Sequence, residues 1–235
     1  MDQAPVSSEA DANRRPLKTR GWAVFGWLAR WLGGAGVSPD AISLASIFFG
    51  VVAGLAFWGT SQVSGSAPVR GLWVAAALFI QLRLIANLLD GMVAIEGGKK
   101  SPLGPLYNEV PDRLADAAIL LGAGYAAGGD ARLGAAATIV AFFVAYVRAM
   151  GTTVGVGQVF LGPMAKPHRM ALLTAASVVC AASPVAWRPE SHGYLGVIGW
   201  SLAVVVVGGL ITSARRLVEI ARRLHAGDQA GGRGG

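Results

Sequence analysis

The sequence predicts an all-α integral membrane protein with six transmembrane helices, preceded by a short N-terminal amphipathic helix at the membrane interface. Three observations predict this fold class. Hydrophobic residues make up 54% of the chain and charged residues only 14%, whereas a typical soluble domain carries about 25% charged residues. The hydrophobic residues form runs long enough to cross a bilayer as helices. Lys and Arg flank these runs mainly on one side, as is typical of cytoplasmic loops.

The N-terminal part of the chain changes character at about residue 20. Residues 1–19 are polar and lack an apolar core, so we expect a disordered cytoplasmic tail and not a signal peptide. Residues 20–33 contain Trp22, Trp27 and Trp31, and indole rings favour the headgroup region. We expect a helix lying in the interface, although the same segment would also fit as the beginning of the first span.

Six apolar runs follow this segment. Ser38 and Pro39 precede the first run as an N-cap and a proline at the first helical position. The spans are expected at about residues 41–58, 71–94, 102–126, 133–151, 170–187 and 194–213. Six spans place both termini on one side, and the excess of basic residues on that side predicts the cytoplasm. The predicted organisation is therefore a cell-membrane domain over 20–224, followed by a disordered tail over 225–235.

The positive charge of the chain admits a second interpretation. A formal net charge of +7 would suit nucleic-acid binding if the basic residues formed a stripe. They flank the apolar runs instead. The sequence therefore predicts a lipid bilayer as partner and no nucleic acid.

Polar residues interrupt the second and third predicted spans. On the second span, Arg83, Asn87 and Asp90 are spaced i, i+4 and i+7, which places them within about 60° of one helix face. Four more residues lie within about 100° on the third span: Asn108, Glu109, Asp112 and Asp116. A charge at the centre of a lone helix costs roughly 3 kcal/mol. The two polar faces are therefore expected to meet in a hairpin joined by the short loop 95–101.

The chemistry of this cluster favours a hard cation. Clustered carboxylate and amide oxygens without His or Cys favour Mg²⁺ or Mn²⁺ over zinc. Such an ion commonly carries a phosphate or pyrophosphate group. Two other interpretations stay open from the residues alone: a polar network that only holds two helices together, and an ion or proton pathway.

The spacing of these residues resembles the signature of the CDP-alcohol phosphotransferase family, D-x2-D-G-x2-A-R-x8-G-x3-D-x3-D. The matching positions are Asn87, Asp90, Gly91, Ala94, Gly104, Asn108 and Asp112. Further similarity to the family lies upstream, at 36–43, and downstream, at 146–148 and 166–169. The sequence departs from the signature at Asn87 and Asn108, where the family has aspartate, and at Ile95, where it has arginine. The resemblance covers roughly residues 20–220.

The resemblance implies an enzyme of phospholipid biosynthesis. It would move a phosphatidyl-type group from a CDP-activated lipid such as CDP-diacylglycerol to an alcohol acceptor, with release of CMP. The implied cofactor is Mg²⁺ or Mn²⁺. A homodimer is also implied, since many members of the family are dimers. The acceptor, which would carry a phosphate group in some members, is not identified by the sequence.

The resemblance also implies a role for each motif residue, with Asp112 as the base that accepts the proton of the acceptor hydroxyl. The implied metal ligands are Asn87, Asp90, Asn108 and Asp112, with Glu109 and Asp116 as further candidates. The implied nucleotide site is formed by Asp90, Gly91, Ala94 and Gly104. The implied acceptor site is a cationic pocket of Arg148, Lys166 and Arg169.

Two alternative functions remain beside this one. A small six-helix transporter would explain the charges inside the spans, but not their spacing. A catalytically impaired relative that binds CDP-lipid would explain the two asparagines, because an amide oxygen brings no charge to a cation.

Overall fold

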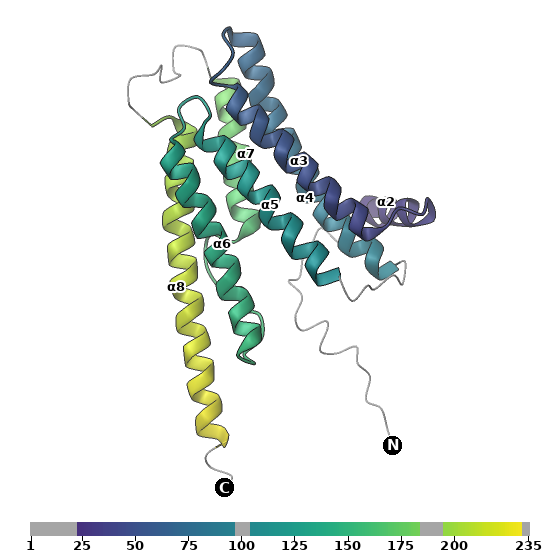
Figure 1. The fold of residues 1–235 in the computed structure, drawn as a ribbon, viewed down its shortest axis with the longest axis vertical. Helices are drawn as coiled ribbons and strands as arrows, with labels where there is room; N and C mark the ends of the chain where they lie inside the picture. The colour runs from purple at the N-terminus through teal and green to yellow at the C-terminus, as the bar shows by residue number, and fades with distance from the viewer. Residues whose placement is uncertain (1–22, 97–103, 184–194, 232–235) are drawn as a thin grey trace.

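The computed structural model describes residues 23–96, 104–183 and 195–231, and this part of the chain is entirely α-helical (Figure 1). The helices are α2 (Ala23–Gly34), α3 (Pro39–Gly59), α4 (Ser66–Glu96), α5 (Gly104–Gly124), α6 (Ala131–Thr153), α7 (Lys166–Ala182) and α8 (Val197–Gly231). Long helices suit a membrane protein because all their backbone hydrogen bonds are made within the segment.

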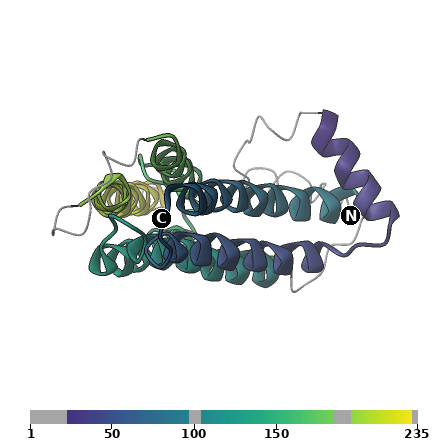
Figure 2. The same ribbon diagram turned by 90° about the horizontal axis from the view of Figure 1, so that it is seen from above.

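The helices form one bundle in which α3 contacts both α4 and α5, α7 packs against α4 and α8, and α6 joins α5 to α8. Figure 2 shows α3 and α4 running side by side, with α2 set across one end of them. One face of α2 packs against α4 through Ala29, while Trp27 and Trp31 are exposed. The segment is thus helical with an exposed aromatic face, and its position at the membrane interface stays a prediction; Trp22 lies outside the described residues.

Four of the helices are long and apolar enough to cross a membrane: Pro39–Gly59, Ser66–Ala94, Ala131–Thr153 and Val197–Ala226. The helix α5 carries the charged motif residues, and α7 is only 17 residues long; neither is among the four. The exposed surface of the four helices is rich in large apolar side chains such as Phe48, Leu55, Ile139 and Trp200. The chain is therefore a multi-pass membrane protein.

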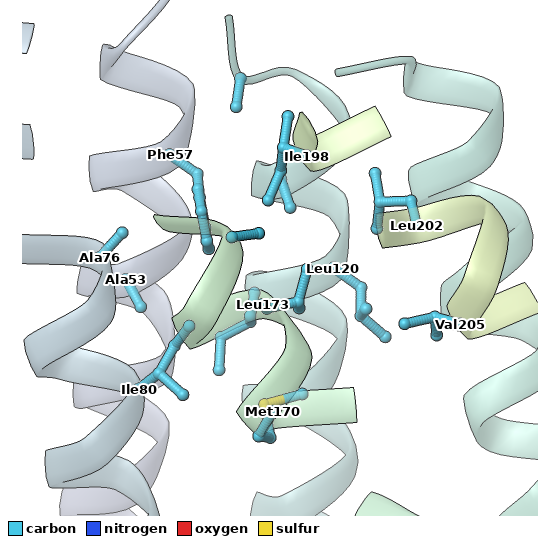
Figure 3. Packing of buried hydrophobic residues seen from close by; sticks show 14 of the residues in the cluster. Ala53, Phe57, Ala76, Ile80, Leu120, Met170, Leu173, Ile198, Leu202 and Val205 are labelled. Carbon is cyan, nitrogen blue, oxygen red and sulfur yellow. The ribbon is translucent and has the colours of Figure 1, made fainter. Parts of the chain in front are cut away.

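The largest apolar cluster and the polar motif residues occupy different halves of the bundle. Figure 3 shows the apolar cluster, which includes Phe57 of α3, Ile80 of α4, Leu120 of α5, Leu173 of α7 and Leu202 of α8. These residues come from the second half of α3 and α5 and the first half of α4 and α8. The polar motif residues lie in the opposite halves of α4 and α5, beyond this cluster.

Small residues bring α3 and α5 into backbone contact. A Cβ atom added to Gly54 would lie 2.3 Å from the carbonyl oxygen of Ala118. A Cβ atom added to Gly122 would lie 2.3 Å from the carbonyl oxygen of Gly54. Close approach through small residues is a common way for membrane helices to pack. It fixes α5, and with it the polar motif residues, against the rest of the bundle.

We expect Gly54→Ala to lower the thermal stability of the purified protein in detergent. Overpacking a close contact typically costs about 1–3 kcal/mol. The control is Gly71→Ala, also within a helix, because a Cβ atom there would meet nothing within 4 Å. Thermal unfolding followed by tryptophan fluorescence measures both, and equal unfolding temperatures for the two variants would contradict the close packing of α3 on α5.

The helix boundaries confirm some expectations and correct others. Ser38 is the N-cap of α3, since its side chain accepts a hydrogen bond from the N–H of Ala41 at 3.2 Å. The helix α7 begins at Lys166, four residues before the expected span, because Pro167 suits a first helical turn. The helix α4 begins at Ser66, inside the expected loop.

The C-terminal tail differs most from its prediction. A disordered tail was expected over 225–235, but α8 continues to Gly231, and residues 232–235 lie outside the described part. Immediately before this extension, Glu219 pairs with Arg223 one turn later, with Arg223 Nε 2.7 Å from Glu219 Oε1, a spacing that supports helices. The predicted tail over 1–19 also lies outside the described residues.

Candidate active site

Asp90 is buried on α4 and is held by neutral donors. The hydroxyl of Ser43, on α3, donates to Asp90 Oδ2 at 2.6 Å. The N–H of Gly91 donates to Asp90 Oδ1 at 2.5 Å. Among the described residues, Asp90 makes no ion pair, although it interacts electrostatically with both Asp112 and Lys166. The Asp90 carboxylate is thus held between α3 and α4 by hydrogen bonds alone.

Asp112 is buried on α5 and is held mainly by two cations, while a third, Arg113, lies further away, with Nη2 3.8 Å from Asp112 Oδ2. Lys166 Nζ lies 2.5 Å from Asp112 Oδ2. Arg83 Nη2 donates both to Asp112 Oδ1 and to the Asp112 carbonyl oxygen, each at 3.2 Å. These contacts join α4, α5 and α7, and they fix the direction in which the carboxylate points.

Asp116, one turn further along α5, is fully buried between two arginines. Arg83 Nη2 lies 2.6 Å from Asp116 Oδ1, and the guanidinium of Arg169 on α7 pairs with Asp116 Oδ2. Both arginines are themselves buried. Asp116 thus has each of its oxygens engaged by an arginine, an arrangement that ties three helices together.

Lys166 connects two positions of the sequence motif. Its ammonium group donates to Asn87 Oδ1 at 2.6 Å and pairs with Asp112 Oδ2 at 2.5 Å. The first turn of α7 therefore inserts a cation between the motif residues of α4 and those of α5.

A second layer of charges lies nearer the surface. Glu109 is about half exposed and pairs with Arg148 of α6 and with Arg113, whose Nη2 is 3.2 Å from Glu109 Oε2. Each of the three cations of the predicted acceptor pocket thus pairs with a different carboxylate. The pairs are Arg148 with Glu109, Lys166 with Asp112 and Arg169 with Asp116.

The chain was compared with known proteins. No family model matches it. It is 29% identical to the phosphatidylinositol phosphate synthase of Streptomyces avermitilis, over 83% of this chain and 77% of the relative. It is 25% identical to the archaetidylinositol phosphate synthase of Pyrococcus horikoshii, over 85% of this chain and 92% of the relative. A shorter match, 33% identical over 39% of the chain and 42% of the relative, is to the inner membrane protein YnbA of Escherichia coli.

Solved structures agree with these relatives. The crystal structure of the Mycobacterium tuberculosis phosphatidylinositol phosphate synthase with CDP-DAG bound matches with a TM-score of 0.68, at 18% identity, over 85% of this chain and 94% of that chain. The chain is thus similar in sequence and fold to phosphatidylinositol phosphate synthases, which are CDP-alcohol phosphotransferases. The structure of the same mycobacterial enzyme in complex with manganese and citrate matches with a TM-score of 0.67.

The donor set of this CDP-alcohol phosphotransferase fits a hard divalent cation. Asp90 and Asp112 supply carboxylate oxygens, and Asn87 supplies an amide oxygen, all of them donors that Mg²⁺ and Mn²⁺ accept. Within the described ranges, no group of three or more His, Cys, Asp and Glu side chains gathers as a metal cluster. The side chain of Asn108 lies outside the described residues. Asp90 is the carboxylate best placed for an ion, because no side chain among the described residues forms an ion pair with it.

The remaining predicted residues line the ends of the two motif helices. Gly91 and Ala94 follow Asp90 on α4, and Gly104 begins α5. A Cβ atom added to Gly104 would meet nothing within 4 Å, so no neighbour among the described residues requires glycine there. Glu109 and Asp116, the further candidate ligands, are both engaged by arginines.

Sequence reasoning assigned no role to two residues of this site. Ser43 belongs to the upstream segment that resembles the family, but its bond to Asp90 joins residues 47 positions apart. Arg83 was noted only as part of a polar face, yet it contacts both Asp112 and Asp116. Buried Arg almost always pairs with carboxylates. This rule was the one signal in the sequence that could have predicted the contacts of Arg83.

Proposed function

We propose that this enzyme transfers a phosphatidyl-type group from CDP-diacylglycerol to a hydroxyl of a phosphorylated alcohol, with release of CMP. The observation that carries the proposal is that Lys166 contacts both Asn87 of α4 and Asp112 of α5, which joins the two motif helices, at the family spacing, in one polar site. Inositol phosphate is the first candidate acceptor, because relatives from Streptomyces, Pyrococcus and Mycobacterium marinum are named as synthases of inositol phosphate lipids.

Asp112 is proposed as the base of this reaction. Its carboxylate takes the proton of the acceptor hydroxyl as that oxygen attacks the phosphorus bearing the diacylglycerol. The bond from this phosphorus to the bridging oxygen of CMP breaks, and CMP leaves with the electron pair. Arg83 and Lys166 hold Asp112 in place, which keeps the base aligned with its substrate.

The cofactor proposed for the site is Mg²⁺ or Mn²⁺, in agreement with the manganese complex of the mycobacterial enzyme. Asp90 would be its main ligand, with Asn87, Asn108 and Asp112 as further candidates, and when bound it would neutralise charge on the diphosphate of the donor. Gly91, Ala94 and Gly104 would give the nucleotide access to the backbone of α4 and α5, since small residues leave room for a ligand. Glu109 and Asp116 are proposed to position neighbouring arginines instead of binding the ion.

Arg148 is proposed as the main contact of the acceptor phosphate. It lies near the surface and pairs with the half-exposed Glu109, so a phosphate group can replace a partner that is also solvated. Lys166 lies deeper, beside Asp112. Arg169 is 2% exposed and pairs with Asp116. Its proposed role is therefore to stabilise the pocket and not to contact the acceptor phosphate.

The placement in the membrane extends the same proposal. The helices α5 and α7 complete six spans, because they pack among the four apolar helices and their charges face inward. The exposed Trp27 and Trp31 of α2 favour a position in the interface. Both termini are proposed to be cytoplasmic. The apolar exterior would also accommodate a second copy of the chain as a homodimer.

The function is tested by CMP release from the purified protein. The assay contains CDP-diacylglycerol, Mg²⁺ or Mn²⁺, and in separate reactions inositol phosphate, glycerol phosphate, inositol or serine. We expect release with a phosphorylated acceptor, and loss of release in EDTA. The lipid product is identified by mass spectrometry. Release of no CMP with any acceptor would refute the transferase, and release with serine alone would refute the phosphorylated acceptor.

We expect Ser43→Ala to slow CMP release by roughly 10-fold or more. A hydrogen bond to a charged group is worth about 1.5–3 kcal/mol, and here it holds the buried Asp90 carboxylate. The control is Ser46→Ala on the same helix, because the Ser46 hydroxyl donates only to the carbonyl oxygen of Ser43 within α3. Initial rates of CMP release compare the two variants, and equal rates would show that Ser43 does not position Asp90.

A further inference from the structure

The ammonium group of Lys166 lies where the sequence motif provides ligands for a cation. It contacts Asn87 Oδ1 at 2.6 Å and Asp112 Oδ2 at 2.5 Å. Asn87 belongs to α4 and Asp112 to α5, so the ammonium bridges the two motif helices as a bound cation would. Its backbone is fixed because Lys166 begins α7 and is followed by Pro167.

The charges of the buried site are balanced without any added ion. Three acidic side chains, Asp90, Asp112 and Asp116, face three basic ones, Arg83, Lys166 and Arg169. Arg113 also approaches Asp112, at 3.8 Å, but its closer partner is Glu109, so this further pair is balanced as well. The family signature would place two more aspartates at positions 87 and 108, where this chain has asparagine. The two asparagines therefore remove two negative charges, which is the charge that one divalent cation neutralises.

The ion pairs in the site are distributed unequally. Asp112 is paired with Lys166 and Arg83, and Asp116 with Arg83 and Arg169. Among the described carboxylates of α4 and α5, only Asp90 lacks an ion pair, and its partners are the neutral Ser43 and Gly91. One side of the site is thus already occupied by a cation of the protein, and the other side is open to an ion.

We propose that Lys166 is a resident cation of the active site, so that this enzyme binds a single divalent ion, on the Asp90 side, instead of a pair. The proposal rests on the transferase function proposed above. An ammonium group has three N–H donors, and the contacts with Asn87 and Asp112 use two of them. The third is directed to the diphosphate of the CDP-activated lipid, where Lys166 supplies the charge that a second metal supplies in two-metal sites.

The number of bound ions tests the proposal directly. Mn²⁺ is titrated into the purified full-length protein in the presence of CDP, and free Mn²⁺ is measured by electron paramagnetic resonance. We expect one Mn²⁺ per chain in the wild type. We expect two in the variant that combines Asn87→Asp with Lys166→Ala, because it restores a carboxylate and removes the ammonium. Arg223→Ala, a basic residue paired with Glu219 outside the site, is the control and should keep one.

Two results would overturn the proposal. Two Mn²⁺ ions bound to the wild type would show that the ammonium leaves the site when metal enters. A single ion in the double variant would show that Lys166 does not determine the count.

A second measurement guards against a double variant that does not fold. The affinity for CDP in EDTA is measured by calorimetry for the wild type and for Lys166→Gln, which keeps a long polar side chain. We expect the substitution to weaken CDP binding at least 10-fold, because the ammonium contacts the diphosphate without metal. Unchanged affinity would overturn the proposal.

Neither measurement depends on turnover. A protein that shows the expected ion counts but releases no CMP with any acceptor would refute the transferase function and retain the resident cation. A protein that releases CMP but binds two Mn²⁺ ions would support the transferase function and refute the resident cation.

Discussion

Asp112→Asn is expected to abolish CMP release while the protein remains folded. An amide cannot accept the proton of the acceptor hydroxyl, and the loss of a positioned general base typically lowers the rate by about 10²–10⁴-fold. The substitution is nearly isosteric and keeps one oxygen, which can still accept from Lys166, while Arg83 keeps its bond to the backbone carbonyl oxygen of residue 112. Initial rates of CMP release with CDP-diacylglycerol and the best acceptor provide the measurement.

The matched control for this variant is Asp130→Asn. Asp130 is the N-cap of α6 and accepts a hydrogen bond from the N–H of Leu133 at 2.9 Å, a role that Asn fills equally well. It should therefore retain full activity. Unfolding temperatures of both variants should stay close to that of the wild type. Full activity of Asp112→Asn would show that Asp112 is not the base. The site would then act only by positioning the substrates.

Asp116→Ala is expected to have the largest effect on stability. It leaves the guanidinium groups of Arg83 and Arg169 buried, and Arg169 would lose the only ion-pair partner that the described residues provide. Removing one partner of a buried ion pair typically costs about 3–5 kcal/mol. The measurement is equilibrium unfolding in mixed micelles, followed by tryptophan fluorescence.

Two further variants separate the charge effect from packing. Asp116→Ala combined with Arg169→Met should regain part of the lost stability, because the uncompensated charge is removed and the apolar stem is kept. Glu219→Ala breaks an ion pair on the exposed part of α8 and should change stability little. If Asp116→Ala were about as stable as the wild type, water must reach the two arginines. The ion pairs of Asp116 would then contribute little to the stability of the fold.

The sequence was sufficient to predict the features that depend on local spacing. Asn87 and Asp90 could be placed on one face of α4, and Asp112 and Asp116 on one face of α5, because helical periodicity relates residues three and four positions apart. The cap at Ser38 is also a local signal, and the structure confirms it. The meeting of the two faces followed from the cost of leaving charges in lipid.

The partners of these residues could not be predicted in the same way. The bond from Ser43 to Asp90 depends on how α3 packs against α4, and the bond from Lys166 to Asn87 spans 79 positions. The place of Lys166 also depends on where α7 begins, and helix boundaries are the least certain part of a prediction from sequence. A cationic pocket of Arg148, Lys166 and Arg169 was expected because charge alone was visible, whereas the pairing of each cation with its own carboxylate is a tertiary property.

The position of the largest apolar cluster has a consequence for lipid traffic if Asp90 holds the ion that binds the donor, as proposed. CDP-diacylglycerol cannot bring its diphosphate to Asp90 through the half of the bundle filled by Phe57, Leu120 and Leu202. The donor must therefore approach sideways from the leaflet that borders the charged end, with its acyl chains still among the neighbouring lipids. The product is released into that same monolayer, so any supply to the opposite monolayer requires a separate flippase.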